Sequence, residues 1–379
     1  MIKVLFLIES LGGGGAEKVL TDIVRSLDKS RYDITVTTIT DNGVYDDEIR
    51  EICKYKSVLK SSFNNGSILQ RLLYKIKYKL IYMLPSKLVY KMIVKEKYDI
   101  EIAFVEGYAT KIIGNSLNKK SKKISWVHVD PIERDYSDKY FRSIDEHSRC
   151  YGKFEKIICV SESVKTSLLN KYRINKNKVV TIYNPIDKNT IIKKSYEHID
   201  DMLKSNFILV TVGRLVEQKG YDRLLKCINK LKNIDKLELE LIILGEGELR
   251  GKLQDYIDRN NLSNNVKLLG FKKNPYKYIA NSNLFVCSSR AEGFSLVIAE
   301  AMTLGIPVIS TNCSGPNELL GFGTYGVLVD NNEEGLYEGL KKIVNNKYEI
   351  DKLVYASKKG ASMFEYEKCI DKIEQLLQN

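Results

Sequence analysis

The sequence predicts an α/β protein made of two doubly wound domains that face each other across a cleft. Three observations support this fold class. The 379 residues exceed the usual size of one hydrophobic core. Short β-branched runs alternate with longer amphipathic stretches, which is typical of parallel sheets covered by helices. This alternation stops in a polar stretch near the middle of the chain and then starts again.

The composition is that of a folded protein in a reducing compartment. Apolar residues make up 44% and charged residues 28%, with only six prolines. No apolar run reaches the ~18 residues that span a bilayer, and Met1–Leu11 carries Glu9 and runs into glycines, so we expect a strand there and not a signal peptide. Seven scattered cysteines without a CxxC pair argue against disulfides and zinc.

The strands of the first half begin at the N-terminus and alternate with helices such as Ala16–Leu27. We expect strands at Ile2–Ile8, Asp33–Thr40, Ile100–Val105, Lys123–Val129, Lys156–Val160 and Val179–Tyr183. We place the end of the first domain after Asn184-Pro185-Ile186-Asp187. The predicted N-terminal domain is therefore 1–187.

The second half restarts the same pattern after the polar stretch Lys188–Lys204. Its predicted strands are Phe207–Val212, Leu239–Leu244, Val266–Leu269, Leu284–Ser288 and Val308–Thr311, and its helices include Leu224–Leu231, Leu249–Ile257 and Leu336–Val344. The predicted C-terminal domain is 188–362. A last helix within 363–379, Phe364–Leu377, is expected to return to the first domain.

A run of glycines follows the first predicted strand and opens the first helix. Gly14 and Gly15 let the backbone approach a ligand, and the helix N-terminus offers N–H groups to an anion. Four consecutive glycines do not match the GxGxxG spacing of dinucleotide-binding loops. The alternative is a tight turn without a ligand.

Two cations follow the first strand of the second half, at Arg214 and Lys219. At the carboxyl end of a strand they could clamp a diphosphate, Arg214 with its planar fork and Lys219 as a point charge. The segment lacks the order of a Walker A loop. The alternative interpretation is a solvated loop.

The segment Glu292–Glu300 carries the strongest signal for a binding site. Glu292 follows the strand Leu284–Ser288, and Ser295 and Leu296 open a helix whose N–H groups face a phosphate. Glu300 lies about 7 Å further along that helix at ~1.5 Å per residue, an offset that suits ribose hydroxyls. The alternative is that Glu300 is a solvated helix residue and Glu292 a capping acid.

Taken in order, these segments resemble the glycosyltransferases of family 4, retaining enzymes with a GT-B fold of two Rossmann-like domains and an E-x7-E motif, also called group 1 glycosyl transferases. The resemblance runs over nearly the whole chain. Its segments are Gly12–Glu17, Trp126–Asp130, Val160–Ser163, Asn184–Asp187, Gly213–Gly220, Leu244–Gly247 and Ser288–Asn317, which includes Glu292–Glu300. Any one of them is weak, but the ordered set at strand ends is specific.

The resemblance implies roles for individual residues. Arg214, Lys219 and the backbone N–H groups of Phe294, Ser295 and Leu296 would bind the diphosphate of a nucleotide sugar. Glu300 would hold its ribose. Glu292 would contact the transferred sugar and stabilise positive charge at its anomeric carbon, while His128 would face the donor sugar. Gly14 and Gly15 would lie near the diphosphate and the acceptor, and His147 and His198 are expected at the surface.

A metal cofactor is not expected. Asp46-Asp47 and Asp200-Asp201 do not follow strands as a DxD motif should. Arg214, Lys219 and a helix N-terminus would instead stabilise the leaving diphosphate as preorganised electrostatics.

The net charge of +12 points to an anionic partner. No acidic residue lies between Glu51 and Glu96, where ten Lys and Arg residues interleave with apolar and aromatic ones. Helices around 69–97 are therefore predicted to lie on an anionic membrane surface; the alternative is a solvated helical face with a buried apolar side. No nucleic-acid-binding motif accompanies the charge.

The predicted function is transfer of a hexose or N-acetylhexosamine, from a UDP-sugar in preference to a GDP-sugar, to a lipid-linked or surface-glycan acceptor. The enzyme would lie in the cytoplasm, peripherally on the inner face of the membrane, and would serve capsule or lipopolysaccharide synthesis. Two alternatives remain open from the sequence. One is a nucleotide-sugar epimerase of the same architecture, and the other is a basic lipid- or nucleic-acid-binding module without catalysis.

Overall fold

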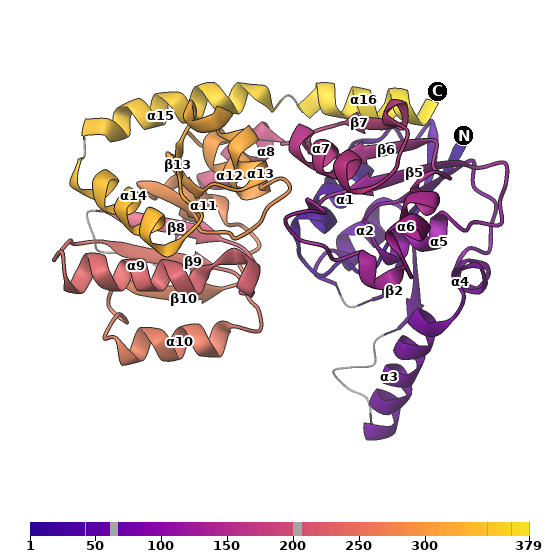
Figure 1. The fold of residues 1–379 in the computed structure, drawn as a ribbon, viewed down its shortest axis with the longest axis horizontal. Helices are drawn as coiled ribbons and strands as arrows, with labels where there is room; N and C mark the ends of the chain where they lie inside the picture. Colours follow the sequence, from indigo (N-terminus) through magenta and orange to yellow (C-terminus); the bar gives the residue numbers. More distant parts are fainter. Residues whose placement is uncertain (42, 61–66, 200–206, 347, 365, 379) are drawn as a thin grey trace. The chain divides into compact units, whose positions relative to one another are not determined.

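The structure is a computed structural model that describes residues 1–379 except 42, 61–66, 200–206, 347, 365 and 379. The chain divides into two compact units (Figure 1). Unit 1 comprises Met1–Pro185 and Glu367–Asn379, and unit 2 comprises Ile186–Tyr366. Asp200 and Asp201, like the end of the polar stretch, lie outside the described residues, whereas the start of that stretch forms the helix α8 (Lys188–Ser195) of unit 2.

Unit 1 is a parallel sheet with the strand order β3-β2-β1-β4-β5-β6-β7. Its strands are β1 (Ile2–Ile8), β2 (Tyr32–Thr40), β3 (Lys54–Leu59), β4 (Ile100–Ala103), β5 (Lys122–Val127), β6 (Lys156–Cys159) and β7 (Val179–Thr181). The central strands β1 and β4 are almost continuously apolar because helices cover both faces of a parallel sheet.

Except for the last one, the helices of unit 1 lie in the crossovers between these strands. They are α1 (Gly15–Ser26), α2 (Asp46–Ile52), α3 (Ile68–Met83), α4 (Ser86–Ile93), α5 (Tyr108–Ile113), α6 (Ile144–Tyr151), α7 (Glu162–Lys171) and α16 (Tyr366–Gln378), with 3-10 turns at Asp138–Tyr140 and Lys176–Lys178. Of these, α3 extends away from the rest of the unit (Figure 1). In the described part of the chain, no helix combines the length and the hydrophobicity needed to cross a bilayer.

The last helix, α16, packs on unit 1. Arg31 pairs with Glu374 at 3.3 Å, and Gln378 donates to the Tyr32 hydroxyl at 3.2 Å. The Lys122 ammonium donates to the carbonyl of Leu376. The two ends of the chain therefore complete the same unit.

Unit 2 is a second parallel sheet, with the order β10-β9-β8-β11-β12-β13. Its strands are β8 (Ile208–Val212), β9 (Glu240–Leu244), β10 (Val266–Gly270), β11 (Leu284–Cys287), β12 (Val308–Thr311) and β13 (Val327–Val329). Besides α8, its helices are α9 (Tyr221–Asn233), α10 (Arg250–Arg259), α11 (Tyr276–Ala280), α12 (Leu296–Thr303), α13 (Ser314–Leu319), α14 (Glu333–Asn345) and α15 (Tyr348–Gly360), with 3-10 turns at Glu217–Lys219, Gly321–Gly323 and Ala361–Met363.

The core of unit 2 lies between the sheet and its helices. The apolar face of α9 buries Leu224, Cys227, Ile228 and Leu231 against β8, β9 and α14. The predicted helices Leu224–Leu231 and Leu336–Val344 are the middle turns of α9 and α14. The helical spacing of apolar residues identified these middle turns because the residues with that spacing form the buried face of each helix.

Every strand expected from the sequence is present, with ends that differ by no more than two residues. Two further strands, β3 and β13, were not predicted, and both lie at an edge of a sheet. β3 contains two lysines and is mostly half-buried, and β13 has three residues. An edge strand tolerates charge and short length, so its sequence lacks the apolar run of a central strand.

In each sheet, the strand order reverses direction between two central strands. In unit 1 this switch point lies between β1 and β4, and in unit 2 between β8 and β11. Ligands of open α/β sheets bind outside the carboxyl ends of the strands at such points. The loops after β1, β4, β8 and β11 are therefore expected to form the ligand-binding sites of the two sheets.

Candidate functional site

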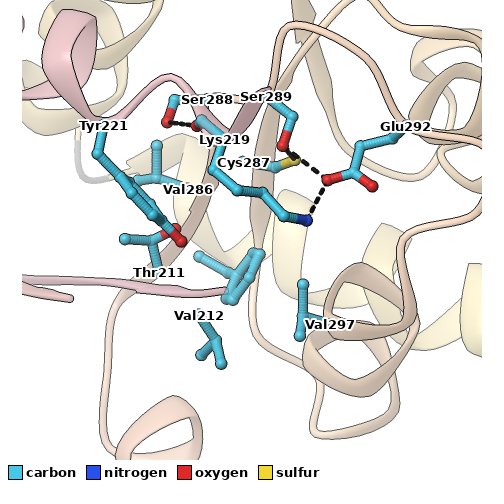
Figure 2. Close-up of a pocket in the computed structure, with 11 residues that line it drawn as sticks. Thr211, Val212, Lys219, Tyr221, Val286, Cys287, Ser288, Ser289, Glu292 and Val297 are labelled. Carbon is cyan, nitrogen blue, oxygen red and sulfur yellow. Dashed lines mark hydrogen bonds and ion pairs between the residues drawn. The ribbon is translucent and has the colours of Figure 1, made fainter. Parts of the chain in front are cut away.

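The two loops at the switch point of unit 2 hold the acid and the lysine that the sequence singled out. Lys219 ends the 3-10 turn Glu217–Lys219 after β8, and Glu292 lies in the loop after β11. The Lys219 ammonium forms an ion pair with Oε1 of Glu292, and the Ser289 hydroxyl donates to the same oxygen at 2.7 Å (Figure 2). Both side chains line a small pocket with Thr211, Ser288 and Val297.

The electrostatics of this pair stabilise the charge of Lys219. Burial disfavours the charge of Lys219, but the neighbouring carboxylate of Glu292 outweighs it, so the pKa of Lys219 is raised. Glu292 is only 7% exposed. Glu292 is not at the N-cap position of α12, which is Ser295, and its carboxylate bonds Lys219 and Ser289, so the alternative of a capping acid is not favoured.

Backbone contacts fix the two loops against each other. The Ser288 hydroxyl donates to the carbonyl of Lys219 at 2.8 Å, and the Gln218 amide donates to the carbonyl of Ala291 at 2.7 Å. Gly220 has φ +66°, and a Cβ there would lie 2.1 Å from the Ser288 carbonyl oxygen. Only glycine allows this approach, and the approach sets the position of Lys219.

Arg214 is exposed beside this pair. Within the described ranges its guanidinium has no ion pair or hydrogen bond, and its charge acts on Lys219. The site thus presents one cation that is held by a carboxylate and one that faces solvent. The geometry brings Arg214, Lys219 and Glu292 together, as the sequence predicted.

The N-terminus of α12 follows Glu292 by a few residues. Phe294, Ser295 and Leu296 are all buried, and Phe294 packs edge-on against Phe364 with ring centres 6.2 Å apart. The Ser295 hydroxyl is buried, and no hydrogen-bond partner for it exists in the described part of the chain. A buried hydroxyl at the N-terminus of a helix suits an anionic ligand.

Glu300 lies one turn into α12 and is 3% exposed. The Tyr276 hydroxyl donates to its Oε1 at 3.4 Å. The alternative of a solvated helix residue is therefore wrong. Its role toward a ribose stays a prediction.

In unit 1 the glycine run connects β1 to α1, at the switch point of that sheet. Gly14 caps α1 and Gly15 is its first residue, one residue earlier than predicted. A Cβ on Gly14 would lie 2.5 Å from the carboxylate of Glu17, and Gly13 has φ +93°. The sharp turn therefore explains part of the glycine content, and a ligand role stays a prediction.

His128 directly follows β5 in the same unit. Its backbone N–H donates to Oε2 of Glu106 at 2.9 Å, and its ring packs on Phe104 and Trp126 with centres 5.0 and 6.2 Å away. Burial lowers the pKa of His128 to about 3, so the imidazole is neutral. Its Nε2 is buried and lacks a partner in the part of the chain that the structure describes.

Glu106 is a residue that the sequence analysis did not identify. It follows β4 at the switch point of unit 1 and holds the backbone of His128. Burial raises the pKa of Glu106 from its ordinary value of 4.5 to about 7. Glu106 could have been identified from its position just after a predicted central strand. Glu9 has the same position after β1.

One expectation about the histidines is wrong. His147 is fully buried, where it bonds Asp138 at 2.9 Å and stacks on Phe141 with ring centres 3.8 Å apart. His198 is exposed as expected. His147 lies on the amphipathic helix α6, whose apolar face is too short to reveal the burial of a single ring.

No metal site emerges from the described residues, which contain no cluster of three His, Cys, Asp or Glu side chains placed to hold an ion. Metal independence remains a prediction, since such a cluster is one of several ways in which an ion could enter the reaction.

Family models match both units. The family described as glycosyl transferases group 1 matches residues 197–361, and the one described as glycosyltransferase family 4 matches residues 13–190. A relative from Campylobacter jejuni, an N-acetylgalactosaminyltransferase that acts on a diphospho-undecaprenol-linked sugar by its name, is 32% identical over 99% of this chain and 97% of its own. An uncharacterised glycosyltransferase of Methanocaldococcus jannaschii is 38% identical over 54% of this chain, which spans about half (52%) of that relative.

Solved structures agree on the fold. Anabaena HepE, crystallised with UDP and glucose, superposes over the whole of both chains with a TM-score of 0.76 at 20% identity. Sucrose-phosphate synthase of Thermosynechococcus elongatus reaches 0.76 at 14% identity, over 100% of this chain and 98% of that one. These findings do not favour an epimerase or a binding module without catalysis. The chain belongs to the glycosyltransferases of family 4, the group 1 glycosyl transferases, and has their GT-B fold.

Proposed function

We propose that this glycosyltransferase moves a hexose or N-acetylhexosamine from a nucleoside diphosphate sugar to a glycan or lipid-linked acceptor in bacterial polysaccharide synthesis. Relatives carry names from amylovoran and capsule synthesis, and HepE was crystallised with UDP-glucose. The complexes of HepE with UDP and UDP-glucose support UDP in preference to GDP. The observation that carries the proposal is the pair of cations Arg214 and Lys219 at the switch point of unit 2, where α12 also begins.

In the proposed reaction, departure of the nucleoside diphosphate leaves negative charge on its phosphates and positive charge on the sugar. Arg214, Lys219 and the N–H groups of Phe294, Ser295 and Leu296 would stabilise the phosphates without a metal. Glu292, held by Lys219 and Ser289, would lie beside the sugar and stabilise its positive charge. Glu300 would bind the ribose, and the anomeric configuration would be retained.

From unit 1 we propose contributions by His128, Gly14 and Gly15. A neutral imidazole with an unpartnered Nε2 is suited to bonding a sugar hydroxyl. The flexible backbone of the glycine turn is suited to close contact with a polar ligand.

The donor site is tested by nucleotide binding in EDTA. We expect UDP and UDP-sugars to bind the wild-type protein in calorimetry, and Arg214→Ala and Lys219→Ala to weaken binding about 10- to 100-fold, because each removes a charged hydrogen bond. Arg259→Ala, on the exposed surface of α10, is the matched control and should bind normally. Unchanged affinity in both site variants, or binding and turnover that need a divalent ion, would overturn the metal-free clamp.

We also propose that the enzyme is peripheral to the inner face of the cytoplasmic membrane, with α3 and α4 on the lipid. The apolar side of α3 is exposed, which argues against the alternative of a solvated helical face with a buried apolar side. Leu72, Ile76 and Met83 are 53%, 47% and 71% exposed, and Leu88 and Met92 on α4 are exposed as well. Arg71, Lys75, Lys79, Lys87 and Lys91 flank this surface and suit anionic headgroups.

Vesicle sedimentation tests this surface. The protein should bind vesicles rich in phosphatidylglycerol, and less at high salt, but not vesicles of phosphatidylcholine alone. Leu72→Glu with Ile76→Glu should abolish binding, while Ile234→Glu, at an exposed apolar position of unit 2, should not. Equal binding by both variants would exclude α3 as the contact.

A further inference from the structure

Five tyrosines form a continuous row in unit 1, which we name the tyrosine ladder: Tyr74, Tyr78, Tyr82, Tyr108 and Tyr140. Successive ring centres are 6.4 Å apart for Tyr74 and Tyr78 and 4.9 Å for Tyr78 and Tyr82. Tyr82 then meets Tyr108 at 4.5 Å and Tyr140 at 6.0 Å. The ladder thus leads from α3 to the loops at the carboxyl ends of β4 and β5.

The outer part of the ladder follows one face of α3. Tyr74, Tyr78 and Tyr82 are spaced by four residues, so their side chains lie one above another along the helix. The apolar residues proposed to contact lipid occupy a different face of the helix, because Leu72, Ile76 and Met83 follow another helical line. The helix therefore separates an aromatic face from an aliphatic one.

The inner end of the ladder is fixed to the sheet. The Tyr82 hydroxyl donates to Oε2 of Glu9, directly after β1, at 2.9 Å, and the Tyr108 hydroxyl donates to the carbonyl of Ile81. Tyr140 packs on Gly107, where φ is +88° and a Cβ would lie 3.0 Å from the tyrosine ring. These contacts place the rings beside the switch point of unit 1.

The outer rings are not explained by this anchoring. Tyr78 is 41% exposed and Tyr74 is half-buried, on a helix that extends away from the unit (Figure 1). Glu9 and Asp41 are carboxylates at the two ends of the ladder. Burial, and then the charge of Asp41, raise the pKa of Tyr74, and burial outweighs the hydrogen bond from Tyr82 in raising the pKa of Glu9.

We propose that the outer rings of the tyrosine ladder, Tyr74 and Tyr78, bind pyranose rings of the acceptor glycan. A pyranose has an apolar C–H face that packs on an aromatic ring, and a rim of hydroxyls that phenols and carboxylates can bond. Tyr78 is 41% exposed, and the inner rings connect this outer surface to Glu9 at the ligand-binding edge of the sheet. The inference rests on the proposed transfer to a glycan acceptor and adds where the acceptor's sugars bind.

The same rings could stack nucleobases, and charge does not separate the two occupants, because Arg71 and Lys75 lie beside the tyrosines on α3 and would attract phosphates. The proposed function favours the saccharide, because a glycan acceptor must bind near the switch point of unit 1. Competition with a nucleic acid is therefore one outcome of the test.

Saturation-transfer NMR provides the test, with a panel of methyl glycosides and disaccharides of glucose, galactose and their N-acetylamino forms as probes. The wild-type protein should transfer saturation from aromatic protons to ring C–H protons of at least one probe. Tyr74→Ala with Tyr78→Ala should weaken that probe's binding about 10-fold. Tyr78→Phe should preserve it, and so should Tyr196→Ala, which removes an exposed tyrosine of unit 2.

UDP binding by the same variants, measured in calorimetry, separates this inference from the proposed function. Normal UDP binding with no saccharide signal in the wild-type protein, or an unchanged signal in the double variant, would overturn the ladder as a glycan site. Loss of signal on addition of an oligouridylate that itself binds would assign the ladder to nucleic acid instead. Failure of the wild-type protein to bind any nucleotide would count against the proposed transfer alone, since saccharide binding is read independently.

Discussion

Lys219 and Glu292 come from loops 73 residues apart in the chain, and their ion pair joins the ends of β8 and β11. Removing the lysine leaves the carboxylate with Ser289 as its remaining hydrogen-bond donor among the contacts described above. We expect Lys219→Met to lower the free energy of unfolding by roughly 2 to 4 kcal/mol, because a buried charge loses its partner. Urea unfolding measures this loss. Glu292→Gln made together with Lys219→Met should recover part of it, and strictly additive losses would argue against the pair.

Glu106 and His128 have pKa values shifted in opposite senses by burial. The folded protein holds a proton on Glu106 between pH 4.5 and about 7, where the unfolded chain has released it. The free energy of unfolding of the wild type therefore falls as the pH rises through this window, because only the unfolded chain gains from releasing the proton. We expect Glu106→Gln to gain stability relative to the wild type between pH 5 and pH 8, by on the order of 1–3 kcal/mol.

His128 titrates with the reverse sign. The unfolded chain takes up a proton below pH 6.5, whereas folded His128 does so only near pH 3, so the wild type loses stability as the pH falls. His128→Asn should gain stability relative to the wild type from pH 7 to pH 5. The difference in urea midpoint between each variant and the wild type should therefore change with pH in opposite directions for Glu106→Gln and His128→Asn. Differences that change in the same direction would contradict the assignment.

The sequence located most of the unit 2 site because its residues follow strands. Arg214, Lys219, Glu292 and Ser295 each lie beyond the end of a predicted strand, which is where parallel sheets bind ligands. Glu106 has the same position but stands alone, without a second residue to form a recognisable spacing. Burial of Glu300 and His147 depends on side chains from distant parts of the chain, Tyr276 for Glu300 and Tyr172 for His147, so no local pattern records it.

At the level of elements, α4 is tied to β4 by a buried contact. The Tyr90 hydroxyl donates to Oε1 of Glu101 at 2.6 Å, and Glu101 is fully buried in the central strand. We expect Tyr90→Phe to lower the free energy of unfolding by about 2–3 kcal/mol, because a buried carboxylate loses a hydrogen bond. Tyr355→Phe, on the exposed surface of α15, should change stability by less than about 0.5 kcal/mol. A similar small effect of both changes in thermal or urea unfolding would mean that water replaces Tyr90.

Central strands, amphipathic helices and the edge strands β7 and β10 were predictable, whereas the edge strands β3 and β13 were not. The exposure of α3 was not predictable either. β1 and β8 are buried on both faces and read as apolar runs, whereas β3 and β13 need less burial. The basic stretch around 69–97 predicted helices, but its apolar side gave no sign of whether protein or solvent covers it. Whether protein covers the apolar side of α3 depends on how α3 packs on the rest of unit 1, which involves residues from the whole sheet.

For the molecule as a whole, each unit has its own sheet, but unit 1 needs residues from both ends of the chain. A chain that ends at Tyr366 would lack α16 and its contacts with Arg31, Tyr32 and Lys122. We expect it to retain protection of amide hydrogens in β8, β9 and β11 and to lose protection in β1 and β2, because only unit 1 loses packing. Hydrogen exchange followed by mass spectrometry measures this, and uniform protection in both chains would show that α16 contributes little.

The return of α16 to unit 1 also has a consequence for biosynthesis. A ribosome releases residues 1–185 well before residues 367–379. At ~5–20 residues per second, the intervening 186–366 takes roughly 10 to 40 s to translate. During that interval the nascent unit 1 exposes the surface that the apolar side of α16 covers in the complete protein. We expect a chaperone to bind this surface until α16 has been synthesised.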